Sequence, residues 1–447
     1  MTDNRDQGWI SGRTSGDAEP GIVFSNVRIL DGTGENPFTG EVTVVGNRIR
    51  SVVRAGSGLS WGAASSPALR IDGRGMTLMP GLIDAHLHLS WNNAPGIDPI
   101  QMMPIEEHML SCVEMAKVVL DAGFTSGYGA AAAKPRLDVV IRDAINAGRF
   151  PGPRYTAACP EITAVGGLGD SSKPHIQHEG LNLGLVVSGA EEVRRTVRQM
   201  IKWGVDTIKI NLSGEEITGM GAEENQFTDA EIDAAVSEAK RRGKRLAAHA
   251  RSKEAVRKCV EVGIETIYHA SFTDEKTLDL LEAARERHFV APGLAWLINT
   301  ARHAADFGIL PGTPLTAAYE RELEHAVESM KKMHKRGIRV LIGGDYGFAW
   351  TPHGTNAKDL ETFVTMLGMS PIEAIRAATM YGGQLMGRGH ELGLIREGYL
   401  ADLLLVDGDP TTDIRVLQKA NRLVAIMKDG KFHKEPDVRR WGRSNGG

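Results

Sequence analysis

Strand-like and helix-like segments alternate regularly between residues 82 and 345, and this alternation restricts the fold more than any other feature. Short apolar runs are each followed by a stretch with the 3.6-residue periodicity of an amphipathic helix. Eight such runs occur, which is the number of strands in a closed (β/α)8 barrel. The sequence therefore predicts an α/β fold, a TIM barrel over residues 79–395. The expected strands lie near residues 82–88, 123–127, 155–158, 207–211, 246–249, 266–269, 289–291 and 340–345, and the expected helices near 106–122, 136–147, 190–203, 229–242, 253–262, 275–287 and 317–336.

The two ends of the chain share a different pattern, in which short β-rich runs are separated by turn sequences. Three such runs, IVFSNVRIL, EVTVVG and RIRSVV, occur near the N-terminus, and the same pattern returns near the C-terminus. We therefore expect residues 21–78 and 396–435 to form one composite β-sandwich domain, with the barrel inserted between its halves. Residues 1–20 are expected to be a flexible tail. Residues 436–447 form a second tail that could dock on a neighbouring subunit of a homo-oligomer through Trp441.

Composition and charge exclude several classes of protein. The 447 residues are 42% hydrophobic and 24% charged, as is usual for soluble globular enzymes. A net charge of −4 gives no basic footprint for nucleic acid or an acidic membrane surface, so we expect a small-molecule partner. Three scattered cysteines, the lack of a signal-like apolar core and the lack of a membrane-length apolar run favour a cytoplasmic location.

A pair of histidines, His86 and His88, ends the first predicted barrel strand, in the stretch LMPGLIDAHLHLS. Alternate residues of a strand share one face, so both imidazoles are expected to point the same way and could hold one metal ion. About 0.4 His-x-His pairs are expected by chance in a chain of this composition, so the pair alone is a weak signal. Its weight depends on what the other strands carry.

Four more groups suited to metal chemistry end later predicted strands: Lys209 in DTIKINLSG, His249 in RLAAHARS, His269 in TIYHASFTD and Asp345 in VLIGGDYGF. Each residue alone is more often a hydrogen-bonded or ion-paired core residue than a ligand. Together they would meet at the C-terminal rim of one barrel, where the active sites of this fold lie. Their joint occurrence is much harder to explain as packing.

These residues and their surroundings resemble the amidohydrolase superfamily over nearly the whole chain. The resemblance includes PGLIDAHLHL, the ordered strand-end residues, SPIEAIRAATMYGG and LGLIREGYLADLLLVDGDP. It implies a metal-dependent hydrolase with one or two divalent ions, most often zinc, with iron, manganese or cobalt as alternatives. By resemblance, one ion would be bound by His86, His88 and Asp345 and a second by His249 and His269, with Lys209 bridging both as N6-carboxylysine. Asp345 would take the proton from the attacking water and pass it to the leaving nitrogen.

The substrate is less constrained by the sequence. The resemblance is greatest to a branch that holds phenylurea and thiocarbamate (molinate) hydrolases together with Xaa-Pro dipeptidases and ochratoxinase-like amidases. Tyr128, Leu168, Arg251 and Tyr268 stand where peptidase-like members often have other residues. We therefore expect an apolar N-aryl urea or thiocarbamate, such as a phenylurea herbicide. Apolar side chains of the predicted mouth loops would suit such a substrate: Trp91, Met102, Met103, Trp296, Phe307, Phe348 and Trp350.

Two alternatives stay open. The chain could hydrolyse Xaa-Pro dipeptides or N-acyl amino acids, with Arg251 or Lys173 clamping the carboxylate. A third class, a non-catalytic barrel used for assembly, is disfavoured because all six candidate ligands are present. Tyr128, Arg251, Trp296 and His353 are the candidate substrate-binding residues. Arg154 is expected to be a structural ion-pair residue instead.

Overall fold

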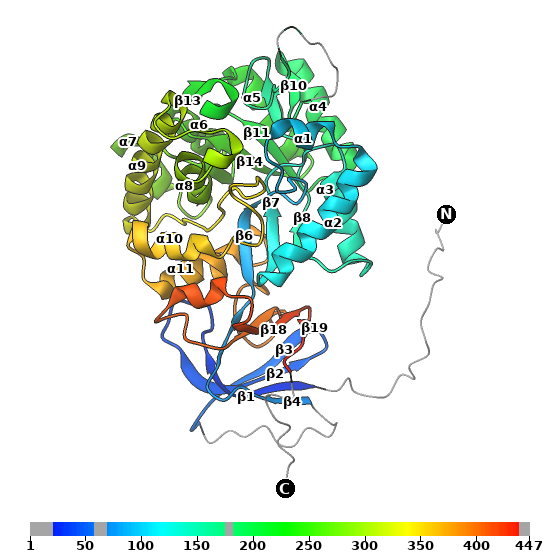
Figure 1. Cartoon of the computed structure of the whole chain (residues 1–447), viewed down its shortest axis with the longest axis vertical. Helices are drawn as coiled ribbons and strands as arrows, with labels where there is room; N and C mark the ends of the chain where they lie inside the picture. Colours follow the sequence, from blue (N-terminus) through cyan, green and yellow to red (C-terminus); the bar gives the residue numbers. More distant parts are fainter. Residues whose placement is uncertain (1–20, 58–68, 174, 176–181, 438–447) are drawn as a thin grey trace, which may run out of the picture.

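The computed structural model describes residues 21–57, 69–173, 175 and 182–437, so the first predicted tail and residues 438–447 of the second, with Trp441, lie outside the described residues. Figure 1 shows a barrel of strands and helices above a smaller region of strands. The predicted α/β barrel is confirmed. Its strands are β6 (Leu82–Leu87), β7 (Phe124–Gly129), β8 (Arg154–Thr156), β11 (Thr207–Asn211), β14 (Arg245–Ala250), β15 (Thr266–His269) and β16 (Phe289–Ala291).

Backbone hydrogen bonds carry the parallel pairing around the barrel. An isolated parallel bridge between Ala158 and Thr207 continues the sheet from the end of β8 to β11. The eighth segment comprises residues 340–345. The backbone N–H of Leu341 donates to the carbonyl oxygen of Val290 at 2.8 Å, and the N–H of Ala85 donates to the carbonyl oxygen of Ile342 at 3.0 Å. The segment therefore lies between β16 and β6. It is less regular than the predicted strand, because only one bridge forms before Gly343, Gly344 and a left-handed Asp345 turn the chain into the site.

Helices cover the barrel and begin soon after the strand ends that matter for the site. Ser252 caps α6 by accepting from Ala255 at 3.0 Å, and Asp274 caps α7 by accepting from Thr277 at 2.9 Å. Helix α7 ends four residues before the predicted boundary, and α8 follows β16, where no helix was predicted. The helices are α1 (Ile97–Met102), α2 (Ile105–Asp121), α3 (Leu137–Asn146), α4 (Ala190–Trp203), α5 (Asp229–Arg241), α6 (Lys253–Val262), α7 (Glu275–Ala283), α8 (Leu294–Arg302), α9 (Pro314–Lys335), α10 (Lys358–Leu367), α11 (Pro371–Ala378) and α12 (Met380–Leu385).

Two short strand pairs sit in the connections above the barrel. Strands β9 (Ile162–Ala164) and β10 (Leu185–Val187) pair in parallel after β8, and β12 (Ser213–Glu215) and β13 (Met220–Asn225) form an antiparallel hairpin after β11. The β12–β13 hairpin therefore follows the strand that carries Lys209. Among the described residues, no helix is long and apolar enough to cross a membrane.

Strands from the two ends of the chain form one eight-stranded sheet in the order β19-β18-β17-β5-β1-β2-β3, with β4 also paired to β1. The sheet curves around its own hydrophobic core. This brings β3 close to the start of β17, where the backbone N–H of Ile49 donates to the carbonyl oxygen of Tyr399 at 2.9 Å. Buried Arg154 of the barrel forms ion pairs with Asp402 and Asp429, so its predicted structural role is borne out. The strands are β1 (Ile22–Ile29), β2 (Phe38–Val45), β3 (Arg48–Arg54), β4 (Leu69–Asp72), β5 (Thr77–Pro80), β17 (Leu403–Val406), β18 (Leu423–Lys428) and β19 (Lys431–Lys434).

Candidate metal centre

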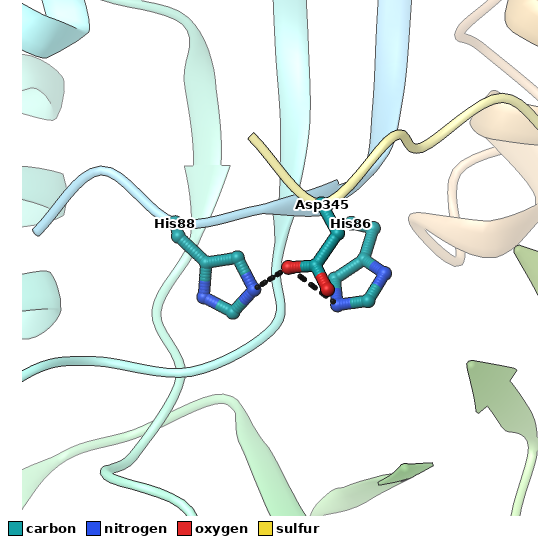
Figure 2. A group of neighbouring side chains, drawn as sticks. All are labelled: His86, His88 and Asp345. Atoms are coloured by element: carbon teal, nitrogen blue, oxygen red, sulfur yellow. Dashed lines mark ion pairs between the residues drawn. The ribbon is translucent and has the colours of Figure 1, made fainter. Parts of the chain in front are cut away.

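His86, His88 and Asp345 converge at the C-terminal rim of the barrel. Asp345 Oδ1 lies 3.0 Å from His88 Nε2 and 3.5 Å from His86 Nε2, and all three side chains are buried. Figure 2 shows the carboxylate between the two rings, with His86 near the end of β6, His88 just after this strand and Asp345 on the eighth segment. Their potential ligand atoms lie within 4.8 Å of one another. Two imidazoles and a carboxylate at this spacing form a donor set that suits a divalent metal ion.

The hydrogen bonds of His88 indicate that a cation belongs in this group. Its Nδ1 lies 3.0 Å from the carbonyl oxygen of Ala131, which can only accept, so the ring carries its proton on Nδ1. With the proton on Nδ1, His88 turns Nε2 towards Asp345 Oδ1, and neither of these buried atoms has a hydrogen-bond partner among the described residues. Two acceptors 3.0 Å apart repel each other, and a metal ion between them would resolve the conflict.

His249 and His269 lie beside this group on the adjacent strands β14 and β15, with ring centroids 4.3 Å apart. His249 Nε2 lies 3.0 Å from the carbonyl oxygen of Gly214 and 3.2 Å from Nε of Arg251, so this ring nitrogen faces the buried polar network. Both ring nitrogens of buried His269 lack a hydrogen-bond partner within the described part of the chain. The strand ends therefore bring five of the six predicted ligands together around one point.

The sixth predicted ligand, Lys209, lies within β11 and is only 2% exposed. Its ammonium lies 4.9 Å from the ring centroid of Tyr268, and no carboxylate of the described residues lies within ion-pair distance. Burial lowers the pKa of Lys209 below its ordinary value. Burial outweighs the attraction of the nearby carboxylates of Glu161 and Asp345, and the neutral amine of lysine is the form that reacts with carbon dioxide.

The protonation states of the other groups also suit metal binding. Burial lowers the pKa of His86, His249 and His269 well below the ordinary value, which keeps these rings neutral. Burial opposes ionisation of Asp345, but His86 and His88 outweigh it and hold the pKa of this carboxyl below its usual range. Neutral imidazoles and an ionised carboxylate are the forms that bind metals.

Two of the candidate ligands have strained backbones. His269 and Asp345 adopt φ angles of 73° and 63°, in the left-handed region that non-glycine residues rarely occupy. Such strain of about 1–3 kcal/mol gathers at functional sites, where it aims a side chain in a required direction. Gly293 lets the chain pass close to this point, since a Cβ there would lie 2.9 Å from His269 Nδ1. The local backbone is therefore shaped around the candidate ligands.

A cavity opens onto these ligands. Its wall is largely apolar, and three of the aromatic residues predicted to face the substrate, Trp91, Trp296 and Phe348, take part in it. The wall also includes Ile97, Leu168, Leu183, Ile217 and Thr218, together with Glu161 and Glu215. The other predicted mouth residues, Met102, Met103, Phe307 and Trp350, do not line this cavity.

Among the four predicted substrate-binding residues, only Trp296 lines the cavity. Tyr128 is fully buried inside the barrel and accepts a hydrogen bond from Thr207 at 3.0 Å. His353 Nε2 contacts the carbonyl oxygens of His88 and Trp91 at 3.0 and 2.9 Å, so it braces the turn after β6. These two side chains support the site from behind its wall.

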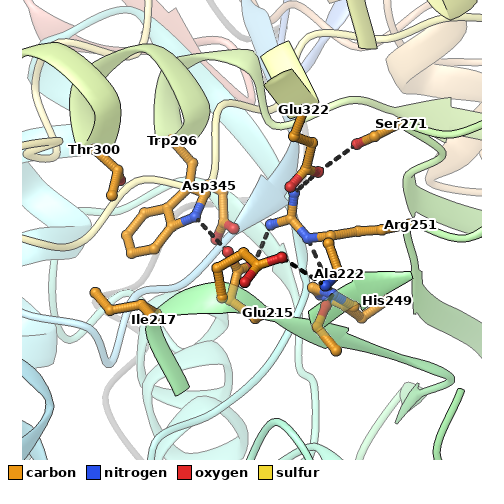
Figure 3. A network of polar contacts seen from close by, with 12 residues as sticks. Glu215, Ile217, Ala222, His249, Arg251, Ser271, Trp296, Thr300, Glu322 and Asp345 are labelled. Carbon is orange, nitrogen blue, oxygen red and sulfur yellow. Dashed lines mark hydrogen bonds and ion pairs between the residues drawn. The ribbon is translucent and has the colours of Figure 1, made fainter. Parts of the chain in front are cut away.

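Arg251 also lies behind the wall, in a buried polar network (Figure 3). Its guanidinium is fully buried and forms ion pairs with Glu215 and Glu322. Trp296 donates to Glu215 at 3.2 Å, which joins the network to the cavity wall. Because two carboxylates already bind this guanidinium, Arg251 is not a free clamp for a substrate carboxylate. Lys173, the other predicted clamp, is exposed and does not line the cavity.

Among the cavity residues that sequence reasoning missed, two are acidic, Glu161 and Glu215, and both are 5% exposed. Each follows a barrel strand closely, Glu161 after β8 and Glu215 after β11. An acidic residue just past a barrel strand, in the connection at the C-terminal rim, was the signal that could have found them.

The chain belongs to the Amidohydrolase family, whose model matches residues 77–432. This result confirms the family that the motifs predicted, and with it an enzyme of the hydrolase class that acts on carbon–nitrogen bonds. Ochratoxinase of Aspergillus niger is 28% identical over 393 residues, covering 82% of this chain and 77% of the relative.

Solved structures support the same assignment. A prolidase complexed with N-methylphosphonate-L-proline is 27% identical, with a TM-score of 0.82 over 93% of this chain and 100% of the other. Phenylurea hydrolase B shares the fold at 22% identity, with a TM-score of 0.73 over 92% of this chain and 96% of the other. These relatives act on different substrates, so the comparisons leave the substrate of this chain open.

Proposed function

We propose that this protein is a metal-dependent hydrolase that cleaves the carbonyl C–N bond of an uncharged, apolar amide, urea or carbamate. The observation that carries the proposal is the buried convergence of His86, His88, His249, His269 and Asp345 at one end of an apolar cavity. Lys209, if carboxylated on its amine, would complete this set of metal ligands. We propose one or two divalent ions, most readily zinc, since neutral imidazoles and carboxylates suit it.

A bound divalent ion supplies a water of lowered pKa and polarises the substrate carbonyl. Asp345 holds the proton of the attacking water, because its carboxylate is ionised and faces the same point as the histidines. The same carboxyl then delivers that proton to the leaving nitrogen, so that the amine departs neutral. The apolar wall limits competing water at the reacting carbonyl.

The charge of the wall supports an uncharged substrate. Apart from Lys209, the described residues that line the cavity include no lysine or arginine, and two carboxylates, Glu161 and Glu215, face the same space. A substrate carboxylate would meet these groups without a cation to pair with. The three aromatic side chains of the wall suit an aryl group of the substrate instead. An N-aryl urea or thiocarbamate, such as a phenylurea herbicide, therefore stays our preferred substrate.

A second candidate is an amide of an N-acyl amino acid or an Xaa-Pro dipeptide. The similarity to ochratoxinase over 82% of this chain favours it. This function needs a cation for the substrate carboxylate, which the described wall does not offer outside Lys209. A homo-oligomeric state and a cytoplasmic location stay predictions.

The test is turnover by protein reconstituted with zinc, manganese or cobalt. It would be incubated with N-aryl ureas, thiocarbamates, N-acyl amino acids and Xaa-Pro dipeptides, and products would be identified by mass spectrometry. We expect arylamine or secondary amine from the uncharged compounds, and at least a 10³-fold loss of kcat in Asp345→Asn and His249→Ala. Near-wild-type activity in either variant would refute the proposed roles of these residues.

A further inference from the structure

Glu161 is a buried carboxylate that the hydrolytic mechanism does not use. It is 5% exposed and lines the cavity, yet its carboxylate has no hydrogen bond or ion pair with any described residue. Buried carboxylates normally accept several hydrogen bonds, because an unpaired one loses several kcal/mol of solvation. A carboxylate oxygen that faces a cavity without a hydrogen-bond donor is complementary to a donor that arrives with the ligand.

The backbone fixes the position of Glu161 beside the metal ligands. Strand β9 pairs in parallel with β11 through Ile162 and Ile210, so the residues that precede them, Glu161 and Lys209, are also opposite each other. The carbonyl of Glu161 accepts from Leu185 at 2.7 Å, which holds its backbone between two strands. The side chain therefore projects from a rigid position next to Lys209.

The neighbouring loop makes room for the carboxylate. A Cβ at residue 169 would lie 2.8 Å from Glu161 Oε1, so the glycine at this position allows the close approach. Gly184 donates to Gly169 at 3.0 Å, which keeps the two loop backbones together over the side chain. Leu168 and Leu183, next to these glycines, give the cavity an apolar surface at this point. The surroundings thus offer one acceptor within an apolar wall.

We propose that Glu161 determines substrate specificity by accepting a hydrogen bond from a substrate N–H group that lies beside the scissile carbonyl. The proposal rests on the proposed function, because it assumes that the carbonyl lies at the metal ligands. A neutral N–H fits better than an ammonium, since the bound metal ions would repel a cation at this place. Substrates with an N–H, such as secondary amides and N-aryl ureas, are therefore preferred over fully N-alkylated analogues.

The test compares two ligands that differ by one methyl group: N-phenyl-N′,N′-dimethylurea and its N-methyl-N-phenyl analogue. Dissociation constants would be measured with zinc-reconstituted wild type, Glu161→Gln and Glu161→Ala by the change in tryptophan fluorescence, since Trp91 and Trp296 line the cavity. The two ligands also differ in their own preferred conformations. This difference affects the ratio of their dissociation constants equally in every variant, so it cancels when the ratios of the variants are compared.

We expect wild type to bind the N–H compound about 10- to 100-fold tighter than the N-methyl compound, as for a hydrogen bond to a charged acceptor. The ratio falls to near unity in Glu161→Ala and to an intermediate value in Glu161→Gln, whose carbonyl still accepts. Glu224→Gln, which removes an exposed carboxylate from the nearby hairpin, keeps the wild-type ratio. An unchanged ratio in Glu161→Ala would overturn the proposal.

Two further readouts separate the alternatives. Metal content measured by mass spectrometry should equal that of wild type in both Glu161 variants, and its loss would make Glu161 a metal ligand and overturn the proposal. Turnover of the same ureas tests the proposed function by itself. Binding with a Glu161-dependent preference but without turnover would reject the urea substrate while leaving the acceptor role of Glu161 standing.

Discussion

Asn356 donates its side-chain amide to Asp84 at 2.8 Å, which ties the segment after Asp345 to the strand that carries His86. The other carboxylate oxygen of Asp84 accepts the backbone N–H of His86 at 2.8 Å. One buried carboxylate therefore holds both sides of the candidate metal group in register. Supporting contacts of this kind fix the direction of metal ligands.

The first prediction concerns this support. Asn356→Ala removes the donor to Asp84, so the segments that carry His86 and Asp345 can shift relative to each other. We expect metal affinity to fall about 10- to 100-fold, while the fold is retained. Competition with a fluorescent chelator measures the affinity, with Asn146→Ala on the outer helix α3 as a control. Equal affinities in wild type and Asn356→Ala would show that the contact does not position the ligands.

Lys209 gives a second prediction. If its amine is carboxylated and bridges two ions, reconstitution should depend on bicarbonate as well as on the metal. We expect Lys209→Ala to hold less metal per chain than wild type and to lose the bicarbonate dependence, because no amine is left to react. Inductively coupled plasma mass spectrometry measures the metal content. A Lys209→Ala protein with full metal content and activity would exclude the bridging role.

The Arg251 network predicts a large effect on stability. Arg251→Met leaves Glu215 and Glu322 buried without their shared cation, and breaking such a pair costs about 3–5 kcal/mol. Urea unfolding followed by circular dichroism measures the change. Arg302→Met, which removes a surface pair with Glu320, should change the unfolding free energy by no more than about 1 kcal/mol. Similar small effects in both variants would contradict the proposed importance of the buried pair.

A pH-dependent effect follows from Asp138. Burial raises its pKa to about 7, although Tyr155 and Ala158 donate hydrogen bonds to it. The folded protein thus keeps a proton between about pH 4 and pH 7 that the unfolded chain has released, so this contribution to stability is lost as the pH rises through 7.

Asp138→Asn removes that contribution. Between pH 5 and pH 8, the unfolding free energy of the variant should fall by about 2–3 kcal/mol less than that of wild type. Urea titrations at both pH values measure the difference. Parallel losses in the two proteins would mean that Asp138 is ionised throughout this range.

The sequence was sufficient for features that depend on local order along the chain. Strand β11 and helix α6 have the predicted bounds, because apolar runs and helix periodicity are local patterns. His249 and His269 could be placed together because parallel strands end at the same rim. The eighth strand is less regular than the sequence predicted. The two glycines before Asp345 allow the chain to turn, and the apolar pattern of the segment does not reveal this turn.

Partners that are distant in sequence could not be predicted in the same way. Arg251 looked available to a substrate because its two carboxylates, Glu215 and Glu322, lie 36 and 71 residues from it. His353 looked like a site residue because it follows Asp345, yet its ring braces the turn after His88. These roles depend on which side chains the closed barrel brings together, and periodicity does not contain that information.

The most direct test compares two amides that differ only by a carboxylate: N-benzoylphenethylamine and N-benzoylphenylalanine. Their kcat/KM values would be measured with the metal-reconstituted protein by quantifying released benzoate. Because the wall presents Glu161 and Glu215 and Arg251 is already paired, we predict at least a 10-fold preference for the uncharged amide. A preference for N-benzoylphenylalanine would contradict this account and assign the cavity to N-acyl amino acids.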